Sequence, residues 1–451
     1  SMESKEPRLT SGSVSHHLIN MTVPVLFGIS MLMLQGFVDA YFIGQVGDRE
    51  LAALSFGYPI LMIVTSVAIG LGAGTSSVVA RAIGAQNLKR ARRLATDSLL
   101  LSFLITGSIS MLGIITIFPL FRILGAPEEM IPLIAGYMRI LYFGVPFMVV
   151  GMVGMACMRA TGDTRLPSML MVIASIANII LDPIFIFGFG PIPEMGLDGA
   201  AMAALIARGS IFLGTLVFMY SRLDMLSFNV PKIIELKSSW FDILHVGVPA
   251  AATNAIIPLA TAIITAMLAR YGPDVVAGFG VASRIESLAL VMFYALSAII
   301  GPFVGQNTSA GRADRILRAL RLCMIFCVFT GLMIALMLFL MSNFLVTLFS
   351  NNPVIIGVAI QFLLIVPISY GAHGVVMIMT ASFNGMGKPI PAVVISVGRM
   401  MALYVPMAFL LGYFYGIAGI FIAYGLANVL SGIVAYFWAR FSVRGQIEKF
   451  A

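Results

Sequence analysis

Long apolar runs occupy this sequence from end to end, and they limit what it can fold into. Each is near or above the roughly 20 residues that an α-helix needs to cross the hydrocarbon core of a membrane. The twelve runs lie at 17–44, 51–80, 94–118, 130–158, 166–188, 197–221, 240–269, 276–305, 316–342, 354–382, 390–412 and 417–440. Only 10% of the residues are charged, against about 25% in soluble proteins. We therefore predict an all-α integral membrane protein with twelve transmembrane helices, and we exclude a soluble enzyme and a disordered chain.

The distribution of lysine and arginine predicts which side of the membrane each connection faces. The termini and even-numbered connections carry 20 of these residues, whereas the odd-numbered connections carry three, Arg49, Arg122 and Arg270. Because basic loops stay in the cytoplasm, both termini are predicted to be cytoplasmic, in a multi-pass protein of the cell (inner) membrane. The net charge of +8 is then a topology signal, so we expect no nucleic-acid partner. The polar residues 1–16 and the long first run argue against a cleavable signal peptide.

The two halves of the chain resemble each other at a constant offset of 225 residues. The pairs that match at this offset include Pro24 with Pro249, Arg90 with Arg315, and Gly162 with Gly387. Six spans in each half make the repeats parallel, which by analogy is a transporter architecture. We predict two pseudo-symmetric six-helix bundles, at 1–222 and 240–451, joined by a cytoplasmic linker at 223–239.

Two acidic residues interrupt the apolar runs. Asp39 lies in the first span and Asp182 in the fifth. A charged side chain at this depth costs at least about 2.5–3.5 kcal/mol, so it indicates a functional site by default. Both acids lie roughly 8–9 Å below the outer end of their helices, from the helical rise per residue. Asn178 is one turn before Asp182, and Tyr137 lies at a comparable depth in the fourth span.

These acids have no counterparts in the second half, where Ile264 and Met407 stand at the matching positions. Because the two acids occur only in the first half, they indicate a function that this half performs alone. Burial disfavours the charged form of a carboxylate, which allows proton exchange near working pH. Together with an amide carbonyl, the same groups could instead ligate Na⁺. The alternative interpretation is structural, with the acids paired to Arg139 or Arg208.

Further polar residues lie within or beside these spans. Arg284 and Glu286 in the eighth span do not share a helix face, so we expect each to pair with another helix, or else to serve cation coupling in the second half. Gln35 lies one turn before Asp39, and Met171 and Ser175 continue the stripe of Asp182 at helical spacing. We predict that Gln35, Met171 and Ser175 line the substrate pocket.

Two loop motifs resemble signatures of the multidrug and toxic compound extrusion (MATE) family. They are Met158-Arg-Ala-Thr-Gly-Asp-Thr-Arg-Leu-Pro167, after the fourth span, and Gly305-Gln-Asn-Thr-Ser-Ala-Gly-Arg-Ala-Asp-Arg315, after the eighth. The resemblance implies an antiporter that exports amphipathic, often cationic drugs against an inward flow of H⁺ or Na⁺. It implies no enzyme activity, no cofactor and no bound metal other than a coupling ion.

The acidic pair is similar to the coupling site of the DinF-like branch of that family. In that branch the coupling ion is bound by residues that match Asp39, Asn178, Asp182 and Tyr137. The resemblance also makes Pro24 a hinge at which the first helix bends when its acid is protonated. Archaeal relatives add a hydroxyl from helix 6, whereas residues 200–209 contain none, which favours H⁺ over Na⁺.

Two rival functions remain open at this point. A lipid-linked-precursor flippase of the same superfamily would use cationic residues in its cavity, and four arginines lie inside spans. These are Arg139, Arg208, Arg284 and Arg399. An intramembrane enzyme such as a prenyl transferase would need clustered Asp-rich loops, which the sequence lacks. The partners that we expect are small drugs, the coupling cation and membrane lipid, and we expect a monomer.

Overall fold

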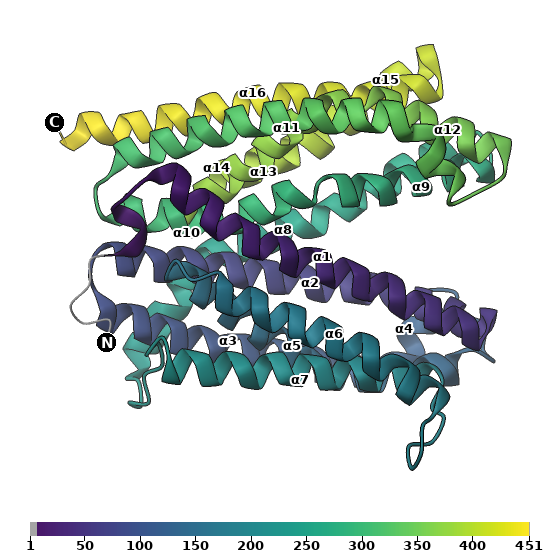
Figure 1. Cartoon of the computed structure of the whole chain (residues 1–451), viewed down its shortest axis with the longest axis horizontal. Coiled ribbons are helices and arrows are strands. Elements are labelled where there is room, and N and C mark those ends of the chain that lie inside the picture. Colours follow the sequence, from purple (N-terminus) through teal and green to yellow (C-terminus); the bar gives the residue numbers. More distant parts are fainter. Residues whose placement is uncertain (1–6, 451) are drawn as a thin grey trace. The chain divides into compact units, whose positions relative to one another are not determined.

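Helices make up nearly all of the computed structural model, which describes residues 7–450 (Figure 1). Within those residues the one pairing of extended backbone is an isolated bridge between Phe189 and Ile192. Among the described residues, eleven helices or continuous helical segments are long and apolar enough to cross a membrane, and α9 and α10, bent by 49°, make up a twelfth span as a broken pair. The predicted twelve-helix membrane fold is confirmed, and the break is a feature that hydropathy did not predict.

The chain divides into two compact units, and the first extends from Met21 to Ala251. It contains most of α1 and the first part of α8. Its helices are α1 (Val14–Val46), α2 (Asp48–Gly84), α3 (Leu88–Ile115), α4 (Ile117–Ile123), α5 (Ile131–Ala160), α6 (Arg165–Phe187), α7 (Leu197–Ser221) and α8 (Ile233–Ala269). Its core includes Val79, Val149 and Val153, which are fully buried.

The second unit combines Leu9–Asn20 with the chain from Ala252 onward. Three of its helical segments are not α-helical: η2 and η3 are 3₁₀ turns and η4 is a π-helix. Its elements are η2 (Arg8–Thr10, of which Arg8 lies outside the unit), α9 (Pro273–Ala289), α10 (Val291–Ser309), α11 (Ala313–Thr347), α12 (Pro353–Ile365), η3 (Pro367–Ser369), α13 (Tyr370–Gly385), α14 (Pro389–Val397), η4 (Gly398–Tyr404), α15 (Val405–Tyr415) and α16 (Ile417–Phe450).

The boundary between the units differs from the predicted domain boundary. The proposed linker at 223–239 lies within the first unit, and its last residues already form the start of α8. The division falls later, between Ala251 and Ala252 inside that helix. Residues 9–20 group with the second unit because Arg315 and Asn307 bind the backbone of the segment that leads into α1.

Matching turns in the two halves use the same backbone conformation. Gly162 has a φ of 95° and Gly387 a φ of 76°, and both lie in the turn after a helix. Gln86 (φ 60°) and Gly311 (φ 70°) form a second pair. Both pairs are separated by the 225 residues of the sequence repeat. Left-handed backbone favours glycine, so Gln86 occupies this conformation at some cost. This agreement supports the internal repeat.

A close approach of backbones fixes α6 against α7 in the first unit. Gly199 on α7 lies against the carbonyl group of Phe185 on α6, where a Cβ atom would be 2.5 Å from the carbonyl carbon. Small residues let membrane helices pack this closely. The contact lies less than one turn from Asp182, so it holds the acidic part of α6 in place.

Candidate cation-coupling site

Asp39 and Asn178 meet within the first unit, although 139 residues separate them in the sequence. Asn178 Nδ2 donates a hydrogen bond of 3.0 Å to Asp39 Oδ1. Asn178 is fully buried on α6, whereas Asp39 on α1 is half-buried. A long apolar helix therefore presents one carboxylate to an amide on a neighbouring helix.

Asp182 lies beside this hydrogen bond, one turn further along α6. It is fully buried and interacts directly with Asp39. Neither of its carboxylate oxygens has a hydrogen-bond donor among the described residues. A buried acceptor without a donor is costly, and two ionised carboxylates in one buried site repel each other. A proton on either acid would relieve both costs, because a protonated carboxyl group is a donor.

Two further residues of the first unit lie near the acids. Tyr137 on α5, 6% exposed, lies near both Asp39 and Asp182. Arg208 on α7 lies near enough to Tyr137 and Asp39 to attract their charged forms. Within residues 7–447, however, neither acid forms an ion pair with a guanidinium at 4.0 Å or less. Arg139 is exposed and lies over the ring of Phe118 instead.

The structure places the other predicted site residues around the same helices. Gln35 lies within reach of Asp39 on α1, and Ser175 is fully buried with no hydrogen-bond partner for its hydroxyl among the described residues. Met171 packs against Gly28 of α1, where a Cβ atom would lie 3.2 Å from its sulfur. Pro24 lies inside α1. The roles of these residues in substrate binding and bending stay predictions.

The second unit contains a buried polar cluster that the sequence did not reveal as a cluster. Tyr424 donates a 2.7 Å hydrogen bond and Tyr370 a 3.1 Å hydrogen bond to the carboxylate of Glu286. Arg399 donates to Asn428 (2.9 Å) from the π-helix η4, a type of helix that is frequent at functional sites. Glu286 thus finds partners on other helices, and these partners are tyrosines. The sequence feature that could have indicated this cluster is the presence of two ionisable residues, Glu286 and Arg399, within apolar runs.

We expect Asn178→Leu to lower efflux at a fixed ion gradient by roughly tenfold, the effect of losing one hydrogen bond to a charged group. Leucine keeps the volume of the buried side chain but removes the hydrogen bond that Asn178 donates to Asp39 Oδ1. Dye efflux from proteoliposomes measures this loss. Asn254→Leu on α8 changes the same residue type outside the acidic site and serves as the control. Equal efflux rates for the two variants would show that Asn178 does not contribute to the coupling site.

The chain is similar to known membrane transporters over nearly its whole length. The family profile described as MatE matches residues 24–184 and 249–410. A protein of Shewanella oneidensis named FAD transporter is 38% identical over 435 residues, 96% of each chain. The probable multidrug resistance protein YoeA of Bacillus subtilis is 26% identical over 448 residues, 97% of each chain. A crystal structure of a mutant of the Vibrio cholerae MATE transporter VcmN matches with a TM-score of 0.92 and 32% identity, covering 96% of this chain and 97% of that one.

Proposed function

The chain belongs to the MatE family of membrane transporters, and on that basis we propose that it is a cation-coupled antiporter, driven by H⁺ in preference to Na⁺. In this proposal it exports small amphipathic compounds, often cationic drugs or toxins, by alternating access. Members of this family are transporters and not enzymes, so an intramembrane enzyme is excluded.

One observation carries the coupling proposal. The buried carboxylate of Asp182 has no hydrogen-bond donor among the described residues and lies directly beside Asp39. Loading a proton supplies the missing donor and removes the repulsion between the acids. Losing the proton restores both costs. Ion occupancy therefore changes the energy of the contact between α1 and α6, which is what a transporter needs to bias its two states.

The surroundings of Asp39 favour H⁺ over Na⁺. The Arg208 guanidinium lies near this carboxylate and opposes any added positive charge there, so the preference between the two ions depends on the ligands that the site offers. Residues 200–209 of α7 contain no hydroxyl that could add an oxygen ligand. A proton needs no such shell of ligands, because it is held by one acid and shared with the next.

Pro24 fits the role of a hinge in α1. Proline has no backbone N–H, so the carbonyl of Asn20 lacks its usual helical partner. The division between the two units on this helix falls next to that position, between Asn20 and Met21. A helix that bends there would move Asp39 relative to the N-terminal end of α1.

A second candidate substrate is favoured by one relative. The 38% identical protein of Shewanella oneidensis is named FAD transporter, and FAD is an anionic dinucleotide with two aromatic ring systems. FAD is therefore the first compound to test beside a cationic dye. Export of a lipid-linked precursor is the remaining alternative, and growth rescue of a flippase-deficient strain would support it.

We expect a proton gradient to drive export from proteoliposomes, and an imposed sodium gradient of equal size to drive little or none. Vesicles loaded with ethidium or with FAD separate the two substrate classes. Vesicles without protein and vesicles with no imposed gradient are the controls. Export that follows the sodium gradient alone would overturn the H⁺ assignment, and export of neither compound would count against both proposed substrates.

The location and assembly are part of the same proposal. We place the protein in the cell (inner) membrane with both termini in the cytoplasm, on the 20-to-3 distribution of basic residues. We propose that it works as a monomer. Labelling of single cysteines placed in the connections tests the orientation, and light scattering of the purified protein in detergent tests the monomer.

A further inference from the structure

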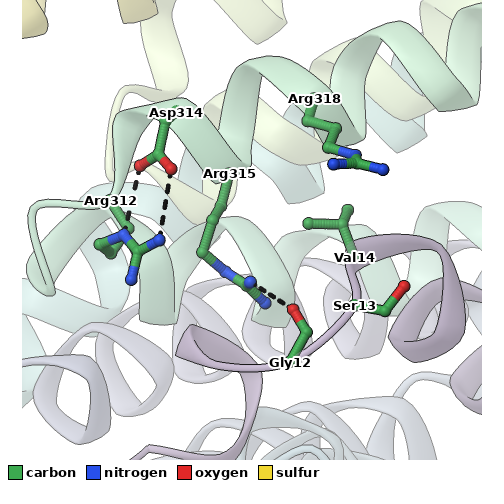
Figure 2. A pocket seen from close by; sticks show the side chains of 7 residues that line it. All are labelled: Gly12, Ser13, Val14, Arg312, Asp314, Arg315 and Arg318. Carbon is green, nitrogen blue, oxygen red and sulfur yellow. Dashed lines mark hydrogen bonds and ion pairs between the residues drawn. The ribbon is translucent and has the colours of Figure 1, made fainter.

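A cavity of about 420 Å³ lies between the N-terminal segment and the start of α11, within the second unit (Figure 2). One wall is formed by Gly12, Ser13 and Val14, where α1 begins. The other wall carries four charged side chains from the beginning of α11. These are Arg312, Asp314, Arg315 and Arg318.

The positive charges in this cavity exceed the negative ones. Arg312 and Asp314 neutralise each other through hydrogen bonds of 3.2 and 3.3 Å. Arg318 is exposed and has no hydrogen bond or ion pair with another described residue. Arg315 and Arg318 therefore leave two guanidinium charges that form no ion pair with a carboxylate of the described residues.

Arg315 is buried, at 7% exposure, and is held in place by neutral acceptors. It donates to the carbonyl oxygens of Gly12 (2.6 Å) and Leu9 (2.8 Å) and to Asn307 Oδ1 (3.0 Å). Figure 2 shows its guanidinium directed at Gly12. These bonds fix its position without cancelling its charge, so the cavity keeps a rigid positive wall.

The position of the cavity matches the polar boundary of a membrane. It lies where α1 and α11, two helices able to cross a bilayer, begin. Strongly exposed apolar side chains follow further along each helix, such as Ile19 (62% exposed) and Ile325 (50%). The cavity is therefore expected at headgroup depth, where basic pockets between helices bind anionic lipids.

We propose that this cavity is a phosphate-binding site, with Arg318 as the free ligand and Arg315 as the fixed positive wall. Guanidinium groups bind phosphate oxygens in pairs. The phosphate can belong to an anionic phospholipid or to a soluble compound. Its occupant would also touch Gly12–Val14, the segment that Arg315 already binds and that leads into α1.

The test uses the full chain in nanodiscs of phosphatidylcholine with a small fraction of phosphatidylglycerol. Native mass spectrometry measures how many phosphatidylglycerol molecules stay bound. We expect Arg318→Ala to weaken this binding roughly fivefold, the effect of removing one arginine near an anionic lipid. Arg318→Lys should keep part of it. Arg321→Ala, an exposed arginine on the same helix that does not line the cavity, is the matched control.

A second arm distinguishes a soluble ligand. Wild type and Arg318→Ala are heated in pure phosphatidylcholine nanodiscs with inorganic pyrophosphate. If pyrophosphate stabilises the wild type but not Arg318→Ala, the site binds soluble phosphate. If Arg318→Ala, but not Arg321→Ala, loses bound phosphatidylglycerol in the first experiment, the site binds lipid. If Arg318→Ala and Arg321→Ala retain phosphatidylglycerol equally, and pyrophosphate stabilises neither wild type nor variant, the proposal is overturned.

Discussion

Asp39→Asn is expected to abolish gradient-driven efflux while the protein still folds and reaches the membrane. The substitution keeps the shape of the side chain, and the new amide oxygen can still accept the hydrogen bond from Asn178. What it removes is the ability to gain and lose a proton beside Asp182. The new amide also offers Asp182 a permanent hydrogen-bond donor and no negative charge, so Asp182 no longer needs a proton and the ion gradient has nothing to act on. Efflux should fall to the level of vesicles without protein.

The controls for this experiment separate transport from folding. Asp48→Asn changes an exposed acid at the start of α2 and should leave efflux unchanged. The melting temperature of the purified Asp39→Asn protein should match that of the wild type. Normal efflux by Asp39→Asn under a proton gradient would reject the coupling site. Loss of efflux together with a large fall in melting temperature would show that the acid is needed for folding.

Gly199→Val is expected to destabilise the protein by about 1–3 kcal/mol or more, the usual cost of forcing extra atoms into a packed interior. The new Cβ would lie 2.5 Å from the carbonyl carbon of Phe185 and 2.8 Å from the nitrogen of Ile186. These are backbone atoms and cannot rotate away, so α6 and α7 must separate. Asp182 would shift with α6, so efflux should fall as well. Thermal unfolding in detergent and dye efflux measure the two effects.

A matched substitution is available on the same helix. Gly209 also lies in α7, but a Cβ atom there would have no heavy atom within 4 Å. Gly209→Val therefore carries the same change in side chain and in helix propensity without the clash. Its melting temperature should stay close to that of the wild type. Equal melting temperatures for the two variants would mean that the backbone contact at Gly199 does not stabilise the fold.

Much of the fold could be predicted because a membrane imposes simple rules. Every backbone polar group in hydrocarbon must be bonded within the protein, so long apolar runs have to form helices. The run at 197–221 became a helix with those same bounds. The break between α9 and α10 and the π-helix η4 escaped prediction. Both lie inside long, mainly apolar runs, each with an ionisable residue close by, Glu286 and Arg399. Such a residue indicates a polar contact, but composition gives no signal for a local change in backbone hydrogen bonding.

The sequence by itself determined that Asp39 and Asp182 are the candidate coupling residues, because an acid in an apolar helix is costly wherever its helix lies. Only the tertiary structure decided that Asn178 bonds to Asp39, that Arg208 lies near this acid, and that Arg139 lies over Phe118 instead. It also decided that Arg315 holds the segment before α1. The physical reason is geometric. Hydrophobic burial sets how far along a helix a residue lies, but the rotation and packing of helices distant in sequence set which side chains meet.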